Sequence, residues 1–332
     1  MQYREIGKSG VKGSAIALGT WAIGGGGFWD GADDDAQAIR TIQEAVESGI
    51  CLIDTAPGYG EGKSERLIGQ AIKGCDRSKL TLSTKCGLIW WGDQGGYMHT
   101  LDGKNYYRNL EPYSMRQEVE MSLERLGTDY IDVYFTHWPS LPSYPTPIER
   151  TMQGLADLKK EGLIKAIGAS NVDLDQIRQY EAAGQLDAVQ PPYSMLNRQI
   201  EGETLDFCME HSISVFAYSP LEQGLLTGRI GMDYQLKDGT YRKDYLTWYR
   251  PENRIRVIRM LDGWKDLTEK YHCTLSQLVI AWTIAQPGIT VALCGARKTK
   301  HLEENVRAGN LTIEKTDLAR MRADAEALGA AE

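Results

Sequence analysis

The stretch ICLIDTAPGYGEGKSE, residues 50–65, contains the unit from which the fold is built. Its apolar run, CLIDT (51–55), is short and leads into a Gly/Pro turn, which is how a buried strand ends. An amphipathic pattern over 64–73 predicts that a helix follows. Asp54 stands at the exit of the strand and Tyr59 in the turn beyond it. The unit therefore carries two chemically active side chains.

The same alternation of short apolar runs and amphipathic stretches recurs along the chain. The predicted strands are 15–19, 51–55, 80–84, 131–136, 164–170, 188–190, 213–219 and 290–295. The predicted helices are roughly 35–48, 64–73, 114–126, 148–161, 173–183, 202–211, 252–271 and 300–308. Eight strand–helix units indicate parallel strands with crossover helices, and eight such strands close a barrel. We therefore predict an α/β fold, a (β/α)8 TIM barrel, formed by a single domain over residues 1–332.

Several segments fall outside this repeat. The first ten or so residues read as a hairpin around GKSG (7–10) that covers the bottom of the barrel, and a final helix is expected over about 314–328. Two loops, about 86–112 and 219–251, are much longer than usual. Both leave C-terminal strand ends, where barrel enzymes keep their active sites.

An open dinucleotide-binding sheet is the alternative α/β fold. The run GGGG (24–27) follows the first strand, but the third glycine of GxGxxG falls on Trp29 or Asp30. Asp54 also comes later than the usual spacing of about 20 residues for the ribose-binding acid. The pattern therefore favours the barrel.

Composition and charge exclude several classes of protein. The net charge of −8 shows no cationic excess for binding nucleic acid or an anionic membrane. The start, MQYREIGKSG, is too polar for a signal peptide. The uncharged stretch 274–296 is interrupted by Gln277 and by QPG (286–288), so we interpret it as a buried helix followed by a strand. No feature of the sequence specifies an oligomeric state.

The cysteines and histidines indicate a cytoplasmic protein without a metal site. The 6 cysteines have no CxxC spacing and mostly lie in apolar runs, which is typical of reduced thiols. The 5 histidines are scattered, without an i, i+4 pair or an HExxH motif.

Four polar residues follow consecutive predicted strands. Asp54 and Tyr59 follow the second strand, Lys85 the third and His137 the fourth. Each has an ordinary structural explanation when taken alone. The ends of successive barrel strands converge at one face, however, so we expect these four side chains to meet there.

Together these residues predict a proton-donating site. A free tyrosine has a pKa near 10, too high for ready proton exchange at neutral pH. We expect the Lys85 ammonium to lower the pKa of Tyr59 by stabilising the phenolate. Asp54 would keep Lys85 charged and oriented, and His137 would hydrogen-bond an oxygen of the substrate.

The motifs DTAPGYG (54–60), STK (83–85) and THWP (136–139) resemble the catalytic motifs of the aldo-keto reductases. Four further segments resemble the cofactor segments of that family, in the same order: GASN (168–171), VQPPYS (189–194), YSPLEQGLLTG (218–228) and GARKTKHLEEN (295–305). The resemblance extends from GTW (19–21) to Asn305. It is greatest to the bacterial branch that includes relatives of potassium-channel β-subunits.

The resemblance implies a (β/α)8 barrel that binds NADP(H) without a Rossmann domain, with NAD(H) left open. It assigns Ser170, Asn171 and Gln190 to the nicotinamide carboxamide, and Tyr218 to stacking under the nicotinamide ring. The other residues that it assigns to the cofactor are Gly19, Thr20, Trp21, Asp54, Ser219, Pro220, Leu221, Gly224, Leu226, Gly295, Ala296, Arg297, His301, Glu304 and Asn305.

Within this set, the resemblance places Arg297 at the 2′-phosphate and Glu304 and Asn305 at the adenine. A guanidinium suits a phosphate because its fork bonds two oxygens. His301 replaces a glutamine that is frequent in the family, and Ser194 replaces a common asparagine.

The function implied is the interconversion of a small-molecule carbonyl compound and its alcohol by hydride transfer, with Tyr59 as the proton donor or acceptor. A cofactor-sensing protein resembling channel β-subunits is the alternative from a different class. A third interpretation is an aldolase that uses Lys85 as a Schiff-base nucleophile, which the cofactor segments disfavour.

The aromatic residues bear on the substrate. With 17 Tyr and 8 Trp against 4 Phe, most rings carry a polar group. The candidate substrate contacts are Trp21, Trp29, Tyr59, Trp90, Trp91, His137 and Trp138; further aromatics expected near them are Tyr97, Tyr106, Tyr107, Trp248 and Tyr249. They act either as packing anchors of the long loops or as walls of a site for a polyhydroxylated ligand. The second interpretation predicts a sugar or sugar-derived substrate.

Overall fold

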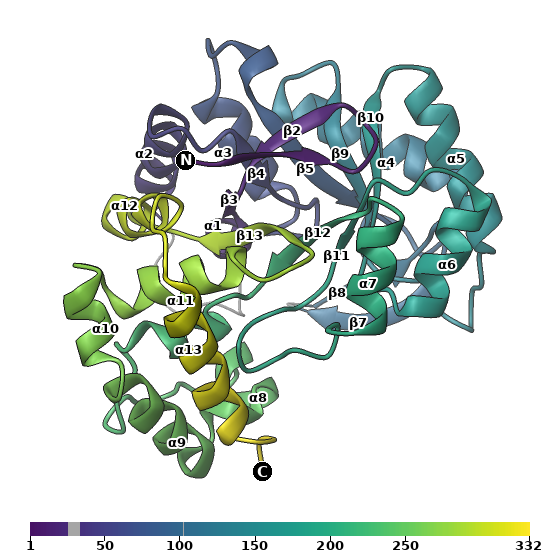
Figure 1. Cartoon of the computed structure of the whole chain (residues 1–332). Coiled ribbons are helices and arrows are strands. Elements are labelled where there is room, and N and C mark those ends of the chain that lie inside the picture. Colours follow the sequence, from purple (N-terminus) through teal and green to yellow (C-terminus); the bar gives the residue numbers. More distant parts are fainter. Residues whose placement is uncertain (26–33, 102) are drawn as a thin grey trace.

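The computed structural model describes residues 1–25, 34–101 and 103–332, and its centre is a closed barrel of parallel strands (Figure 1). Around the barrel the order is β10, β11, β12, β13, β3, β4, β5 and β9. In chain order these strands are β3 (Ile16–Gly19), β4 (Leu52–Asp54), β5 (Thr81–Cys86), β9 (Ile131–Thr136), β10 (Ile164–Ser170), β11 (Ala188–Gln190), β12 (Ser214–Tyr218) and β13 (Ile289–Gly295). The predicted (β/α)8 barrel is confirmed.

The bottom of the barrel is closed by the N-terminal hairpin, as expected. Its strands are β1 (Tyr3–Ile6) and β2 (Val11–Ser14). Ile6 joins the apolar cluster inside the barrel, beside residues such as Phe216. The Gly7 N–H donates to Ser214 Oγ at the start of β12, at 2.9 Å. The opposite, C-terminal face of the barrel is left for the long loops.

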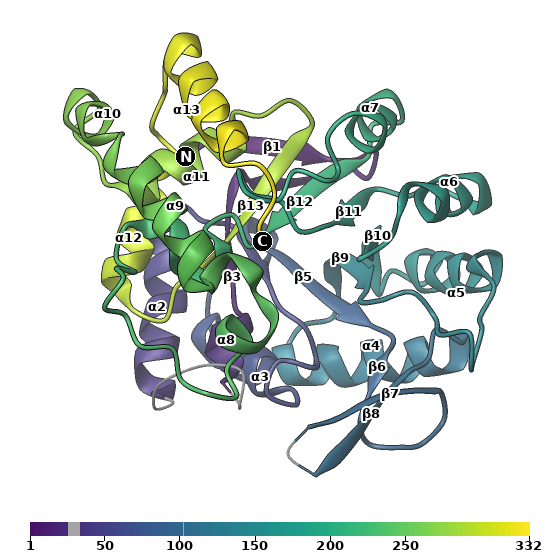
Figure 2. The same cartoon turned by 90° about the horizontal axis from the view of Figure 1, so that it is seen from below.

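Helices surround the barrel (Figure 2). They are α2 (Asp35–Glu47), α3 (Lys63–Ala71), α4 (Pro112–Leu126), α5 (Ile148–Lys160), α6 (Leu174–Ala183), α7 (Glu203–Glu210), α11 (Leu275–Ile284) and α12 (Thr299–Ala308). The last helix, α13 (Lys315–Ala327), packs outside α11, where Trp282 Nε1 donates to Leu318 O at 3.2 Å. No helix in the described ranges has both the length and the apolar character needed to cross a membrane.

The helix expected over 252–271 is wrong in two respects. The structure divides this stretch into α9 (Pro251–Asp262) and α10 (Lys265–Lys270), with Gly263 between them. The helix that packs beside β13 is instead α11, and the buried helix followed by a strand that was predicted for 274–296 is confirmed as α11 and β13. Helix α11 is buried on nearly all sides because α12 and α13 also contact it. The capping box of Thr274 and Gln277 starts it. Gln277, which interrupts the uncharged stretch, is thus a helix-starting residue.

Both long loops are folded and follow barrel strands on the C-terminal face. After β5 the chain forms a small antiparallel sheet of β6 (Leu88–Ile89), β7 (Gly96–Leu101) and β8 (Lys104–Arg108). After β12 it forms η2 (Glu222–Thr227), α8 (Tyr241–Tyr245) and η3 (Thr247–Tyr249). The short α1 (Trp21–Gly24) follows β3 on the same face.

Candidate active site

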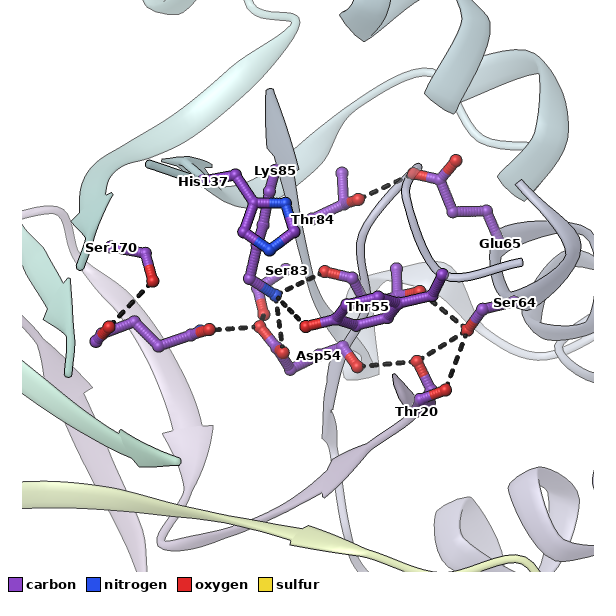
Figure 3. A network of polar contacts seen from close by, with 12 residues as sticks. Thr20, Asp54, Thr55, Ser64, Glu65, Ser83, Thr84, Lys85, His137 and Ser170 are labelled. Atoms are coloured by element: carbon purple, nitrogen blue, oxygen red, sulfur yellow. Dashed lines mark hydrogen bonds and ion pairs between the residues drawn. The ribbon is translucent and has the colours of Figure 1, made fainter. Parts of the chain in front are cut away.

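A buried ion pair joins the ends of β4 and β5. Lys85 Nζ lies 2.9 Å from Asp54 Oδ2, and the two residues are 1% and 2% exposed. The ammonium also donates to the carbonyl of Thr55 at 2.7 Å and to the hydroxyl of Tyr59 at 3.2 Å (Figure 3). All three N–H donors of Lys85 are therefore used, and one of them is directed at the phenol.

Asp54 is held from both sides. Its Oδ1 accepts from Ser83 Oγ at 2.7 Å, on the adjacent strand β5, and from Gln190 Nε2 at 2.9 Å, on β11 farther around the barrel. A buried carboxylate is tolerated only when it is paired and hydrogen-bonded. Asp54 meets this condition, and these contacts hold its carboxylate in one position. Gln190, which the family resemblance assigns to the cofactor, binds Asp54 here.

The predicted lowering of the Tyr59 pKa is wrong in its net direction. Burial raises the pKa of the phenol, Lys85 lowers it, and Asp54 raises it again, so that the net shift is upward. The enclosure of the ring outweighs the ammonium because the charged form is penalised by desolvation. For Lys85, burial alone lowers the pKa, but Asp54 and Tyr59 raise it and prevail. At neutral pH the pair is thus a protonated phenol beside an ammonium.

His137 lies against Tyr59 at the end of β9, with ring centroids 5.9 Å apart and the rings nearly perpendicular. Its backbone N–H donates to Cys86 O at 2.8 Å, and its carbonyl accepts from Asn171 Nδ2 at 2.8 Å. Burial, followed by the charges of Lys85 and Arg108, holds the pKa of His137 well below its ordinary value. The imidazole is therefore neutral. The four residues predicted to converge do lie together.

A chain of buried, hydrogen-bonded hydroxyls ends at the backbone carbonyl of Asp54. Thr55 Oγ1 donates to Ser64 Oγ at 2.9 Å, Ser64 Oγ to Thr20 Oγ1 at 2.7 Å, and Thr20 Oγ1 to Asp54 O at 2.8 Å (Figure 3). Sequence reasoning missed Ser64 and Ser83. The signal that identifies Ser64 is a hydroxyl at the start of the helix that follows the Tyr59 turn.

The turn that carries Tyr59 is pressed against α1. A Cβ atom on Gly24 would lie 2.6 Å from the carbonyl carbon of Tyr59, and Gly60 has φ +63° beside the Gly24 carbonyl. Only glycine permits this close approach. Trp21 thereby comes to 6.4 Å from the Tyr59 ring, and the edge of Tyr241, a residue absent from our predictions, packs on Trp21 at 5.4 Å.

The residues assigned to the nicotinamide form one hydrogen-bonded row. Ser170 Oγ donates to the carbonyl of Gln190 at 2.8 Å. Tyr218 OH donates to Asn171 Oδ1 at 2.9 Å, and Asn171 is held at φ +57°. The row crosses the ends of β10, β11 and β12 and reaches His137 through the Asn171 amide.

The cofactor residues from Ser219 to Leu226 lie in a strained turn over η2. Gln223 has φ +54° and Gly224 φ +103°, between the buried or half-buried Leu221 and Leu226; Ser219 and Pro220 precede them. Tyr249 is 1% exposed and donates to the carbonyl of Gln223 at 2.9 Å. Tyr249 therefore supports this turn from behind and does not line the face of the barrel, contrary to expectation.

Ser194, a departure from the family pattern, has a structural explanation. Its hydroxyl donates to the carboxylate of Glu222 and accepts from the backbone N–H groups of Leu196 and Asn197, at 3.1 and 3.0 Å. The Ser194 hydroxyl thus closes the turn before Asn197 and fixes the Glu222 side chain at the start of η2.

The residues assigned to the adenine end lie after β13. Gly295 pairs in register with Gly19, and Ala296 is buried behind it. Asn305 Nδ2 donates to Gly295 O at 3.5 Å. The carboxylate of Glu304 forms an ion pair with Arg229 from the loop after η2. The half-buried Arg297 and His301 lie between these residues along the chain, and burial lowers the pKa of His301.

The aromatic candidates separate into two groups. Trp138 stacks on His137 at 6.5 Å, while Trp90 packs edge-on against Trp91 at 4.7 Å and beside Tyr106 at 6.1 Å. Others contact neighbouring surface residues: Tyr97 is 54% exposed and pairs with Tyr107, and Trp248 lies under Arg256 of α9. Trp29 falls outside the described residues.

The chain belongs to the aldo/keto reductase family, whose model matches residues 15–326. It is 46% identical over 328 residues to the "NADH-specific methylglyoxal reductase" of Escherichia coli (strain K12), covering 99% of both chains. It is 31% identical over 318 residues to a "probable voltage-gated potassium channel subunit beta" of Arabidopsis thaliana, covering 93% of this chain and 91% of the other. The glycerol dehydrogenase structure from Gluconobacter oxydans matches with a TM-score of 0.86 and 33% identity, covering 98% and 95% of the chains.

These matches confirm the family and its branch related to channel β-subunits. The chain is therefore an oxidoreductase of the aldo-keto reductase type, a family that uses nicotinamide cofactors and small carbonyl compounds.

Proposed function

We propose that this protein reduces an oxygen-rich carbonyl compound to its alcohol, with Tyr59 as the proton donor. The observation that supports this role is the contact of Lys85 with both Asp54 and the phenol, at 2.9 and 3.2 Å. A bound, reduced nicotinamide supplies the hydride. The phenol gives its proton to the carbonyl oxygen, and the adjacent ammonium stabilises the phenolate that remains. The neutral His137 orients the same oxygen.

The side chains at the ends of β10 to β12 fit the nicotinamide end of the cofactor. Asn171 and Gln190 offer amide groups suited to a carboxamide, and Tyr218 offers a ring beside them, fixed by its hydrogen bond to Asn171 at 2.9 Å. Because these groups are already held in place, little ordering is needed when a cofactor binds.

For the choice of cofactor we propose NADP(H). Support comes from Arg297 in GARKTK and from the Klebsiella pneumoniae aldo-keto reductase solved with NADPH, 26% identical to this chain. The name of the Escherichia coli relative, "NADH-specific methylglyoxal reductase", points to NAD(H) instead. A direct comparison of the two cofactors therefore tests this part of the proposal.

Arg297→Ala is expected to weaken NADPH binding by about 1.5–3 kcal/mol, the range for a hydrogen bond to a charged group, and to leave NADH nearly unchanged. Fluorescence titration gives both dissociation constants. Lys300→Ala, which removes an exposed charge nearby in the same segment, is the matched control and should affect neither cofactor. Equal losses for NADPH and NADH in Arg297→Ala would contradict a role at the 2′-phosphate.

For the substrate we propose a sugar-derived or similarly oxygen-rich compound. The relatives whose names mention methylglyoxal and glycerol support small, oxygen-rich substrates. Trp90, Trp91 and Trp138 supply apolar faces for C–H groups near the site.

The experiment measures multiple-turnover oxidation of NADPH, and separately of NADH, with a panel of carbonyl compounds. We expect higher kcat/KM for aldoses and hydroxyaldehydes than for alkyl or aryl aldehydes, because unpaired polar groups in the site penalise apolar analogues. Trp90→Ala should reduce sugar turnover, whereas Trp248→Ala, which removes a ring that lies under Arg256 of α9, should not. Preference for apolar aldehydes would contradict the substrate class. A single turnover with every carbonyl would instead favour the cofactor-sensing alternative.

A further inference from the structure

Arg108, at the end of β8, lies beside the proposed site, although nothing in the sequence motifs marks it. Its Nη1 donates to the carbonyl of Pro139 at 3.2 Å, and its Cζ lies 4.9 Å from the centroid of the Trp138 ring. Trp138 in turn stacks on His137 at 6.5 Å. The small sheet after β5 therefore brings a guanidinium to the side of the residue that we expect to orient the substrate.

The charge of this guanidinium is not neutralised within residues 1–25, 34–101 and 103–332. No carboxylate there lies within ion-pair distance of Arg108, and its Nε is buried without a hydrogen-bond partner. Two other partly buried arginines are paired: Arg77 with Asp132 at 2.7 Å, and Arg125 with Glu65 at 2.6 Å.

Arg254 also has an orphaned Nε, and the comparison with it is informative. Both of its terminal nitrogens donate to backbone carbonyls, those of Tyr234 and Met232, each at 3.1 Å. Arg254 is thus a structural arginine that joins α9 to the loop before it. Among the described residues, Arg108 has a single hydrogen-bond acceptor, the Pro139 carbonyl, so most of its donor capacity is left for another group.

The electrostatic environment agrees with this geometry. Burial lowers the pKa of Arg108, and the charges of Lys85 and Arg108 both contribute to the lowered pKa of His137. Asp54 balances Lys85 at 2.9 Å, whereas Arg108 has no such partner among the described residues. The side of the site next to Trp138 is consequently positive. A partly buried cation without a counter-ion is costly unless a ligand supplies the anion.

We propose that Arg108 is the recognition residue for an anionic group, a carboxylate or a phosphate, on the substrate. The planar fork of a guanidinium binds two oxygens of such a group at once, and the Trp138 face holds that plane in place. The reaction is unchanged: a hydride adds to the carbonyl carbon, the Tyr59 proton goes to its oxygen, and the anionic group keeps all its bonds. This inference rests on the proposed function and names the substrate class of the same site.

The test compares pairs of aldehydes that differ in the anionic group. Glyceraldehyde 3-phosphate is compared with glyceraldehyde, and succinic semialdehyde with butanal. For the unaltered protein we expect kcat/KM at least about tenfold higher for the anionic member of one pair, and the pair that shows it identifies phosphate or carboxylate. Arg108→Gln should abolish that preference by raising KM for the anionic member, with a clearly smaller change in kcat/KM for the neutral member. Lys104→Met, the same loss of charge on the same strand, should leave the preference intact.

Two kinetic outcomes would overturn the inference. One is equal kcat/KM for both members of each pair in the unaltered protein. The other is an equal loss of kcat/KM for both members in Arg108→Gln with an unchanged melting temperature.

A binding experiment that needs no turnover distinguishes failure of this inference from failure of the proposed function. Calorimetry compares the product-like anions glycerol 3-phosphate and 4-hydroxybutyrate with glycerol and butanol. If no carbonyl is reduced, the proposed function fails, yet Arg108-dependent binding of one of these anions would still support the recognition role. Absence of such binding would overturn it.

Discussion

Tyr59→Phe is expected to lower kcat by about 10²–10⁴, the usual contribution of a positioned acid. The substitution removes only the hydroxyl, which Lys85 Nζ contacts at 3.2 Å, and leaves the ring that packs against His137 and Trp21. The phenol is protonated at neutral pH, and burial raises its pKa further, so this hydroxyl can serve as the proton source in the direction of carbonyl reduction. Without it, the oxygen of the carbonyl has no acid beside it.

Steady-state rates measure catalysis and a fluorescence titration measures cofactor binding, so together they separate the two effects of the substitution. Cofactor affinity should be nearly unchanged in Tyr59→Phe, because Tyr59 itself is not assigned to the cofactor and most residues that are assigned to it lie at other strand ends. Tyr97→Phe is the control: among the described residues its hydroxyl bonds only to Thr100 on β7, and the 54% exposed side chain should be dispensable for activity. Nearly full activity of Tyr59→Phe would refute the role assigned to the phenol.

Lys85→Met should lower both activity and stability. It leaves the Asp54 carboxylate buried without its counter-ion, a change that typically costs about 3–5 kcal/mol. Loss of the donor beside the developing phenolate should lower kcat by about 10²–10³. Urea denaturation measures the first effect and steady-state kinetics the second.

Two variants make this prediction specific. Lys165→Met breaks another ion pair, with Asp132 at 3.1 Å, but Lys165 is 46% exposed and Asp132 keeps Arg77, so the loss of stability should stay below about 1 kcal/mol. The double variant Asp54→Asn/Lys85→Met should recover part of the stability lost in Lys85→Met, because no unpaired charge remains. If the double variant is less stable than the single one, the unpaired carboxylate is not the cause.

The convergence of Asp54, Lys85 and His137 could be predicted from the sequence because it depends only on strand order. The strands preceding these residues are apolar enough to be recognised, and parallel barrel strands all end at one face. The hairpin around GKSG was predicted for a similar reason, since its pattern is local. The buried helix within 274–296 was predicted as well, but its place beside β13, in preference to the helix expected over 252–271, was not, because that place depends on contacts of α11 with β13, α12 and α13.

By itself, the sequence determined the barrel, the family and the four residues that meet at the strand ends, since short-range periodicity and motif order specify these features. Only the tertiary structure decided the net pKa shift of Tyr59, because the balance between burial and the nearby ammonium depends on how completely the ring is enclosed. It also decided the place of Arg108. That residue lies 29 positions before His137 in the chain, and only the pairing of β8 with β6 and β7 brings its guanidinium over Trp138. Contacts between residues far apart in sequence leave no periodic signal, so a charge without a partner is recognised only once its neighbours are known.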